Sequence, residues 1–219
     1  MKPLAVIFDW DVTLVDSIDA IKNALNDTFI KFDQKEDIWS RHDVSEWLRK
    51  SMRVSFKDLF KDKAKNATDY FYLRYRDQHL KTVSPMPGAI ETLKTLSSNS
   101  VYLAVVSSKK GNLVRAEAAE LNIESFFAKI VGSSDAREDK PQIAPMELAL
   151  SKADFNLSAN IWYVGDCGID VVCAQNSGCS SIIIGEKPSY VGEKIYVPDQ
   201  HFSNHESFQK FINNIFKFV

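Results

Sequence analysis

The fold is decided by residues 4–17, which read LAVIFDWDVTLVDS from Leu4 to Ser17. Five apolar residues run directly into the carboxylate of Asp9. A short apolar run with β-branched and aromatic residues is typical of a strand that is buried on both faces, as in a parallel sheet. Ligands of open α/β sheets bind at the carboxyl ends of such strands, so Asp9 and Asp11 mark a candidate site.

Asp11 and Thr13 follow Asp9 at intervals of two residues. Two carboxylates this close repel each other unless a cation or a shared proton relieves them, which favours a cation site. The simpler interpretation is a strand end followed by turn residues, because Asp and Thr are common in turns. The rest of the chain has to decide between the two.

The composition is that of an ordinary globular protein. The 219 residues permit one large domain or a core with a smaller second domain, and 45% are hydrophobic and 26% charged. With 27 basic and 29 acidic residues, the chain has no basic footprint for nucleic acid. No apolar run reaches about 18 residues and the N-terminus lacks the shape of a signal peptide, so we expect a cytoplasmic protein without a membrane partner.

The cysteines are predicted to be packing residues. Cys167, Cys173 and Cys179 are odd in number, and their six-residue spacing differs from the paired C-x-x-C spacing of zinc sites. Disulfides are rare in the cytoplasm.

The stretch after Ser17 is predicted to be all-helical. Apolar residues recur at helical spacing over 17–32, 36–50 (with a break near 41–43), 54–63 and 66–81, and no strand pattern appears between 17 and 82. Asp16 or Ser17 is placed to cap the first helix. The string Pro85-Met86-Pro87-Gly88 then marks a turn or hinge.

From residue 89 onward the predicted helices and strands alternate. Helices are expected at 89–96, 112–121, 143–153, 170–177 and 208–216. Strands are expected at 101–107, 127–131, 161–164 and 181–184, with a weaker one at 194–197. Such alternation implies right-handed crossovers and a parallel sheet with helices on both faces. The predicted fold is therefore α/β, with a Rossmann-like core from residues 1–16 and 83–219 and an all-helical cap inserted at 17–82.

Two more polar residues are candidate site residues because of their places beside a strand and a helix. Ser107 stands at the end of the second strand, where its hydroxyl could donate to a phosphate or cap the helix 112–121. Lys140, followed by Pro141, precedes the helix 143–153. It could bring positive charge to the strand ends or be a surface lysine.

The run Gly165-Asp166-Cys167-Gly168-Ile169-Asp170 is a stronger signal. Glycine lets the backbone turn tightly beside a ligand. Asp166 and Asp9 at neighbouring strand ends would form an oxygen-rich site of the kind that Mg²⁺ favours. Asp170 is either part of that site or a first-turn acid of the helix 170–177, where the macrodipole favours it.

These elements together resemble the four ordered motifs of the haloacid dehalogenase-like superfamily, whose members are mainly phosphatases. The residues that carry the resemblance are Asp9-x-Asp11-x-Thr13, Ser107, Lys140-Pro141 and Gly165-Asp166-x-x-x-Asp170. The helical insertion, with Asp16-Ser17 and Pro87-Gly88 near its ends, resembles the cap of the phosphoglycolate phosphatase and β-phosphoglucomutase branch. Members commonly have Gly at the position of Val12.

The resemblance implies a role for each motif. Asp9 would attack phosphorus and form an aspartyl-phosphate, and Asp11 would protonate the leaving oxygen and then activate water. Mg²⁺ would be held by Asp9, the backbone carbonyl of Asp11 and Asp166, with Asp170 as a ligand or a support. The phosphoryl group would be held by Thr13, Ser107, Ser108 and Lys140.

The resemblance favours a Mg²⁺-dependent phosphatase that acts on a small phosphorylated metabolite, with phosphoglycolate-like substrates first. A sugar-phosphate mutase of the β-phosphoglucomutase kind shares every core residue named here. A dehalogenase is disfavoured by Asp11, and a non-catalytic binding protein would not need four carboxylates and a lysine. We expect a monomer or a weak homodimer.

Cap residues offer two interpretations. The cations Arg41, His42, Arg49, Lys50 and Arg53 could face an anionic substrate or be solvated helix residues. Residues 33–60 contain no glycine, whereas some caps of this branch carry a glycine-containing substrate loop. Val15–Ser17 and Pro85–Gly88 are predicted to be hinges.

Overall fold

A computed structural model describes residues 2–34, 37–48, 52–185, 190–191 and 194–217. The chain divides into two compact units. The sheet unit consists of Met1–Val15 and Pro85–Val219, and the helical unit consists of Asp16–Ser84.

The sheet unit is built on six strands in the order β10-β7-β6-β1-β4-β5, and its strand pairs are parallel. β1 lies in the middle, with Phe8 opposite Val105 of β4 on one side and Val164 of β6 on the other. This arrangement confirms the predicted α/β fold. The strand bounds are β1 (Ala5–Phe8), β4 (Tyr102–Lys110), β5 (Lys129–Ser133), β6 (Ile161–Gly165), β7 (Ser180–Ile184) and β10 (Gln200–Phe202).

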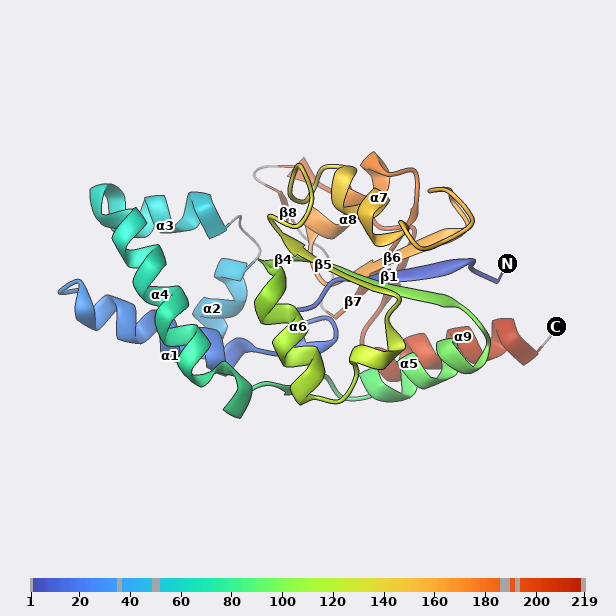
Figure 1. The fold of residues 1–219 in the computed structure, drawn as a ribbon, viewed down its shortest axis with the longest axis horizontal. Coiled ribbons are helices and arrows are strands. Elements are labelled where there is room, and N and C mark those ends of the chain that lie inside the picture. Colours follow the sequence, from blue (N-terminus) through green and yellow to red (C-terminus); the bar gives the residue numbers. More distant parts are fainter. Residues whose placement is uncertain (1, 35–36, 49–51, 186–189, 192–193, 218–219) are drawn as a thin grey trace. The chain divides into compact units, whose positions relative to one another are not determined.

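Helices cover both faces of this sheet. The helices are α5 (Ala89–Ser98), α6 (Gly111–Glu120), α7 (Ala144–Ala149), α8 (Gly168–Asn176) and α9 (His205–Lys217). α7 and α8 lie on one face, and α5, α6 and α9 lie on the other (Figure 1). Alternate strand residues such as Ala5 and Ile7 pack with Met146 and Ala174 in a cluster under α7 and α8. Burial on both faces explains why β1 reads as an unbroken apolar run.

Several boundaries differ from the predicted ones. β4 continues to Lys110 instead of ending at Ser107, because a register shift after Val106 lets the strand pair again at Lys110. α7 ends at Ala149, four residues before its predicted end, and α8 begins at Gly168, before Asp170.

The last strands were only partly predicted. The weak strand expected at 194–197 is β9 (Lys194–Ile195), which pairs antiparallel with β8 (Tyr190–Val191) outside the main sheet. The sixth strand is instead β10, which the sequence does not predict because Gln200, His201 and Phe202 form too short and too polar a run.

The helical unit contains α1 (Ile18–Lys31), α2 (Arg41–Leu48), α3 (Met52–Phe60) and α4 (Ala64–Gln78), with 3₁₀ turns at Lys61–Lys63 and His79–Lys81. Its core is aromatic: Phe29 stacks on Phe60, which stacks on Phe56. α2 begins later than predicted, after Ser40, whose N–H and hydroxyl both donate to the Asp43 carboxylate. The Asp16 carboxylate accepts the N–H of Ile18, the first residue of α1, at 3.3 Å, while the N-cap position itself is Ser17.

Two short strands, β2 (Val15–Asp16) and β3 (Ser84–Pro85), pair where the chain passes between the units. None of the described helices is long and apolar enough to cross a membrane. Cys167, Cys173 and Cys179 are buried and unpaired.

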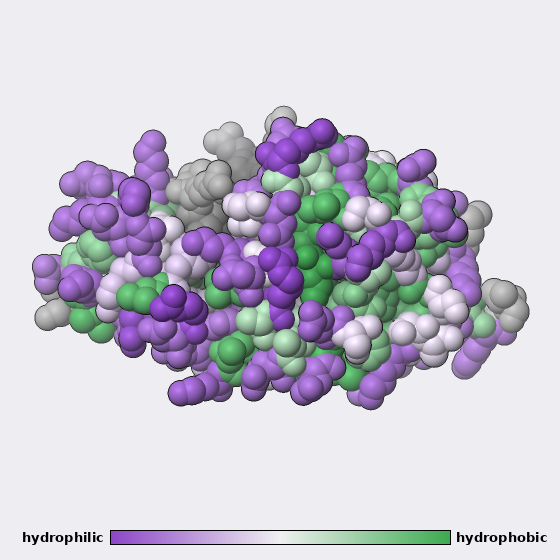
Figure 2. Space-filling view, in the orientation of Figure 1, coloured by the Kyte–Doolittle hydropathy of each residue, from purple (hydrophilic) through white to green (hydrophobic). Residues whose placement is uncertain are grey.

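The exposed edge of the sheet is partly protected. Hydrophobic residues show beside β5 in Figure 2, where Phe127, Ile130 and Leu148 line a shallow hollow. Arg115 donates to the backbone carbonyl of Ile130 at 3.2 Å and pairs with Asp135 at 2.7 Å. Charged side chains of this kind blunt an edge strand against pairing with another chain.

Candidate active site

The central strands bring the predicted motifs together at one edge of the sheet. Asp9 follows β1 directly and continues its pairing, because its N–H donates to the carbonyl of Val164 in β6 at 2.8 Å. Asp166 follows β6, and Ser107 lies in β4 on the other side of β1. After β1 the chain adds β4 and β5 on one side and then β6, β7 and β10 on the other, and open α/β sheets bind ligands where the strand order reverses in this way.

Lys140 is the centre of the polar contacts. Its Nζ lies 2.6 Å from Oδ1 of Asp9, 2.8 Å from Oδ1 of Asp170 and 2.9 Å from the hydroxyl of Tyr163. The Lys140 side chain is only 3% exposed, so the alternative of a surface lysine was wrong. Tyr163 was not predicted as a partner; its hydroxyl also donates to the carbonyl of Val106 at 2.9 Å.

The carboxylates have shifted pKa values. Burial raises the pKa of Asp9 to about 7, because the opposing effect of Lys140 is incomplete and Asp170 adds repulsion. Burial, followed by repulsion from Asp170 and Asp9, raises the pKa of Asp166 well above its usual value. Burial alone would raise the pKa of Asp170, but Lys140 and hydrogen bonds from Cys167 lower it. Asp9 and Asp170 thus share one ammonium group, and Asp166 brings a third carboxyl group to this edge.

Asp170 is a first-turn acid of α8, as one of its two alternatives predicted, and it also contacts Lys140. It is the third residue of α8 and forms a capping box with Cys167. Its Oδ2 accepts the N–H groups of Asp166 and Cys167, each at 3.1 Å, while Oδ1 accepts from Lys140. Gly165 is needed here, since a Cβ at that position would lie 2.2 Å from Cγ of Asp170.

This acidic group has the composition of a cation site. One potential ligand atom from each of Asp166, Cys167 and Asp170 lies within 4.8 Å of the other two. Burial and mutual repulsion raise the pKa values of Asp9 and Asp166, which is the strain that a bound cation relieves. The carboxylate oxygens of Asp166 and Asp170 suit Mg²⁺, whereas the thiol of Cys167 does not.

Hydroxyl groups lie beside the carboxylates. The Oγ1 of Thr13 is buried and has no hydrogen-bond partner among the described residues, which is unusual for a buried polar atom. Ser107 is also buried and accepts the N–H of Lys109 at 3.1 Å. It does not cap α6, whose N-cap residue is Lys110 and which has no side-chain cap hydrogen bond. Ser108 is exposed and makes no hydrogen bond to the other predicted site residues that the structure describes.

Asp11 has a partner that the sequence analysis missed. The Nζ of Lys109 lies 2.6 Å from Oδ1 of Asp11, and its side chain is buried. The period of two along a strand could have suggested this, because it places Lys109 on the same side as Ser107.

His205 is a second missed residue. Its Nε2 donates to the backbone carbonyl of Thr13 at 2.8 Å, and its Nδ1 lies 3.1 Å from Oγ1 of Thr92. Burial lowers the pKa of His205. No local pattern points to this contact, because His205 begins α9, 192 residues after Thr13. The first helix turn of α9 thus supports the loop that carries the first motif.

Val12 occupies the position where family members commonly have Gly. Its φ angle is 64°, in the left-handed region, and its N–H donates to the carbonyl of Val15 at 2.8 Å. The loop therefore keeps the conformation that favours glycine, although a β-branched residue stands there.

Replacing Val12 by Gly is expected to stabilise the protein. An L-residue in the left-handed conformation destabilises the folded state by roughly 1–2 kcal/mol, and Gly avoids this cost. Gly also makes the unfolded chain more flexible, which offsets about 0.5–1 kcal/mol of the gain. We expect the free energy of unfolding to rise by up to about 1 kcal/mol in urea titrations. Val12→Ala, which keeps a Cβ, is the control and should gain less; equal stability of the two variants would contradict strain at this position.

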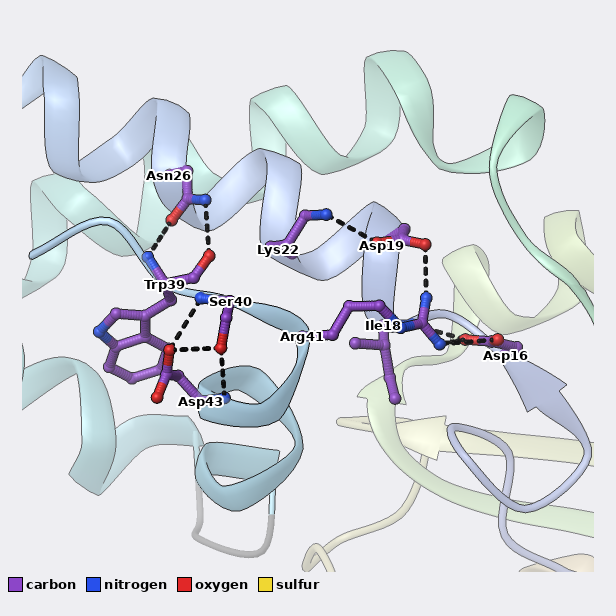
Figure 3. A network of polar contacts seen from close by, with 9 residues as sticks. All are labelled: Asp16, Ile18, Asp19, Lys22, Asn26, Trp39, Ser40, Arg41 and Asp43. Carbon is purple, nitrogen blue, oxygen red and sulfur yellow. Dashed lines mark hydrogen bonds and ion pairs between the residues drawn. The ribbon is translucent and has the colours of Figure 1, made fainter.

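Among the cations of the predicted cap, Arg41 is already paired. Its guanidinium contacts the carboxylates of Asp16 and Asp19, with an Nη2–Oδ2 distance of 3.0 Å to Asp16, and Lys22 lies on the other side of Asp19 (Figure 3). His42 is exposed. Arg49, Lys50 and the side chain of Arg53 lie outside the part of the chain that is described.

Comparison with known proteins decides the family. A family model described as haloacid dehalogenase-like hydrolase matches residues 6–184, which include all the predicted motifs. The chain belongs to the haloacid dehalogenase-like hydrolases. The predicted family and the predicted class of enzyme, a phosphatase of this family, are thereby confirmed.

Two relatives of this hydrolase carry different names. It is 28% identical over 190 residues to a phosphoglycolate phosphatase from Pseudomonas fluorescens, covering 83% of this chain and 69% of the relative. It is 27% identical over 185 residues to pyrophosphatase PpaX from Halalkalibacterium halodurans, covering 84% and 85%. A crystal structure titled "a predicted phosphoglycolate phosphatase" from Haemophilus somnus has the same fold, with a TM-score of 0.83 at 22% identity over 97% of this chain and 99% of that one.

Proposed function

We propose that this hydrolase is a Mg²⁺-dependent phosphatase for a small phosphorylated metabolite and works through an aspartyl-phosphate at Asp9. The observation that carries the proposal is the contact of 2.6 Å between Asp9 and the buried ammonium of Lys140. A carboxylate beside a fixed cation at a ligand-binding sheet edge is suited to attack on phosphorus, because the cation neutralises charge on the transferring group.

Each neighbouring residue has a task in this proposal. Lys140, Thr13 and Ser107 donate to phosphoryl oxygens, and Thr13 thereby gains the partner that it lacks among the described residues. Asp11 gives its proton to the leaving-group oxygen and later accepts a proton from the attacking water. For the exposed Ser108, binding of the phosphoryl group stays a prediction from the sequence.

The acidic edge would hold Mg²⁺ through Asp9, Asp166 and the backbone carbonyl of Asp11. The bound ion supplies charge neutralisation and orients the phosphoryl group. Asp170, whose two oxygens accept hydrogen bonds from Lys140, Asp166 and Cys167, supports this edge. The helical unit is proposed to act as a cap at residues 17–82, and a cytoplasmic monomer or weak dimer stays a prediction.

The names of the relatives define the first substrates to test. A phosphoglycolate-like metabolite comes first, and pyrophosphate comes second because one relative is a pyrophosphatase. A sugar-phosphate mutase would use the same core, so product analysis with β-glucose 1-phosphate separates mutase from phosphatase.

Phosphate release from these three compounds and from p-nitrophenyl phosphate tests the proposal. We expect turnover with Mg²⁺, loss of turnover after exhaustive chelation, and poor replacement by Ca²⁺, which prefers looser and higher coordination. Full activity after chelation would contradict the proposed metal, and an inert protein that binds these esters would instead indicate a non-catalytic binding protein.

A further inference from the structure

A second buried lysine lies beside the first motif. The side chain of Lys109 is 7% exposed, and its Nζ lies 2.6 Å from Oδ1 of Asp11. The same Nζ lies 3.0 and 2.9 Å from the two carboxylate oxygens of Glu117, which is fully buried on α6. Lys109 therefore links the carboxylate of Asp11, at the candidate site, to the carboxylate of Glu117 in the core.

Glu117 is held in turn by the residue between the two aspartates. The indole N–H of Trp10 donates to Oε2 of Glu117 at 2.6 Å, and the Trp10 side chain is fully buried. Since Trp10 and Asp11 are adjacent in the chain, these contacts close a ring. We call it the motif ring; its members are Trp10, Glu117, Lys109 and Asp11. Charge-assisted hydrogen bonds of this kind are stronger than neutral ones, and each member is held from two sides.

The backbone of β4 explains how Lys109 reaches this position. Ser107 and Lys109 are both buried, so the alternation of side chains along β4 continues although its register against β5 shifts between Val106 and Lys110. Ser108 and Lys110 on either side are exposed, whereas Lys109 is buried. The N–H of Lys109 also donates to the hydroxyl of Ser107 at 3.1 Å. One residue thus supports Asp11 through its side chain and Ser107 through its backbone.

We propose, resting on the proposed function, that Lys109 is a positioning residue for Asp11. The motif ring holds the Asp11 carboxylate where it exchanges a proton with the leaving-group oxygen. The alternative is that Lys109 only neutralises Glu117. That task needs one contact between Lys109 and Glu117, and it leaves the second, shorter contact with Asp11 unexplained.

The test compares a poor with a good leaving group. Lys109→Met combined with Glu117→Gln removes both core charges together, so that the fully buried Glu117 carboxylate is not left without its cation. We expect its kcat/KM to fall about 10–10²-fold for an alkyl phosphate, part of the full value of general acid catalysis. For p-nitrophenyl phosphate, whose leaving group needs no proton, the fall should be several-fold smaller. Lys109→Arg, which keeps the charge, should lose less kcat/KM for the alkyl phosphate than this paired variant.

A double-mutant cycle with Asp11→Asn shows whether Lys109 acts through Asp11. In the Asp11→Asn background, the paired variant should cause less than about a twofold further change. Equal losses for both leaving groups, repeated in that background, would overturn the proposal in favour of a structural role. Arg115→Met on the same helix, which breaks the ion pair with Asp135, is the control and should leave the ratio of the two substrates unchanged.

Two further measurements keep this proposal separate from the proposed function. If the wild-type protein hydrolyses no phosphate ester, the proposed function fails, and a crystal structure of the paired variant still tests the ring. An Asp11 carboxylate that moves supports the proposal, and one that stays in place overturns it. If the paired variant does not fold by circular dichroism, Glu117→Gln alone takes its place. It should shift the ratio of the two substrates in the same direction by a smaller factor, and an unchanged ratio overturns the proposal.

Discussion

Asp9→Asn is expected to lower turnover by roughly 10⁴-fold or more, as in other enzymes that lose a covalent nucleophile. The amide is a poor nucleophile, and it removes one of the negative charges that face Lys140. The loss should be the same for good and poor leaving groups, because attack on phosphorus precedes any help from Asp11. Steady-state phosphate release from p-nitrophenyl phosphate and from an alkyl phosphate measures the loss of turnover for a good and for a poor leaving group.

The same substitution should not destabilise the fold. Burial raises the pKa of Asp9 to about 7, so the ionised carboxylate is held at a cost near neutral pH, and a neutral amide avoids this cost. Lys140 keeps its contact with Asp170. We expect a thermal midpoint equal to or above that of the wild type, as is common when an active-site charge is removed. Asp154→Asn, an exposed site in the same unit, is the control; an unfolded Asp9→Asn protein would contradict this account of the charges.

Lys140→Met is expected to lower both the stability of the protein and its turnover. It leaves the buried carboxylates of Asp9 and Asp170 without their shared cation, and breaking such a buried pair costs about 3–5 kcal/mol. Removing one donor to a transition-state charge lowers kcat by about 10²–10³-fold. Urea unfolding and kcat for p-nitrophenyl phosphate give the two numbers.

The metal offers a sharp control for this variant. Because a cation can replace part of the missing positive charge, added Mg²⁺ should restore more stability to Lys140→Met than to the wild type. Lys152→Met, at an exposed lysine of the same unit, should change neither quantity. Near-normal turnover of Lys140→Met would show that its contact with Asp9 is structural only.

The fold was predictable because its signals are local. The apolar run of β1 leads directly into Asp9, and the strands β4 and β6 likewise end near Ser107 and Asp166. Parallel neighbours bring their carboxyl ends to one edge, so the sequence was enough to place Asp9, Ser107 and Asp166 on the same side of the sheet.

What the sequence could not supply are the contacts made over long separations. Glu117 lies 107 residues from Trp10 and His205 lies 192 residues from Thr13, and no pattern of hydrophobic residues connects them. The local sequence left Lys140 with two interpretations, a site residue or a surface lysine, and only the packed loop shows its ammonium between Asp9 and Asp170. The sequence did not predict β10 for a related reason. Its three residues form a strand because they pair with β7 and not because of their own propensity.

The phosphoenzyme of Asp11→Asn tests the central claim most directly. Without the base that activates water, hydrolysis of the aspartyl-phosphate should slow, so the intermediate should accumulate when p-nitrophenyl phosphate and Mg²⁺ are supplied. Acid quenching followed by peptide mass spectrometry should find the phosphoryl group on Asp9 and none in Asp9→Asn. A phosphoryl group on another residue, or a phosphoprotein formed by Asp9→Asn, would contradict Asp9 as the nucleophile.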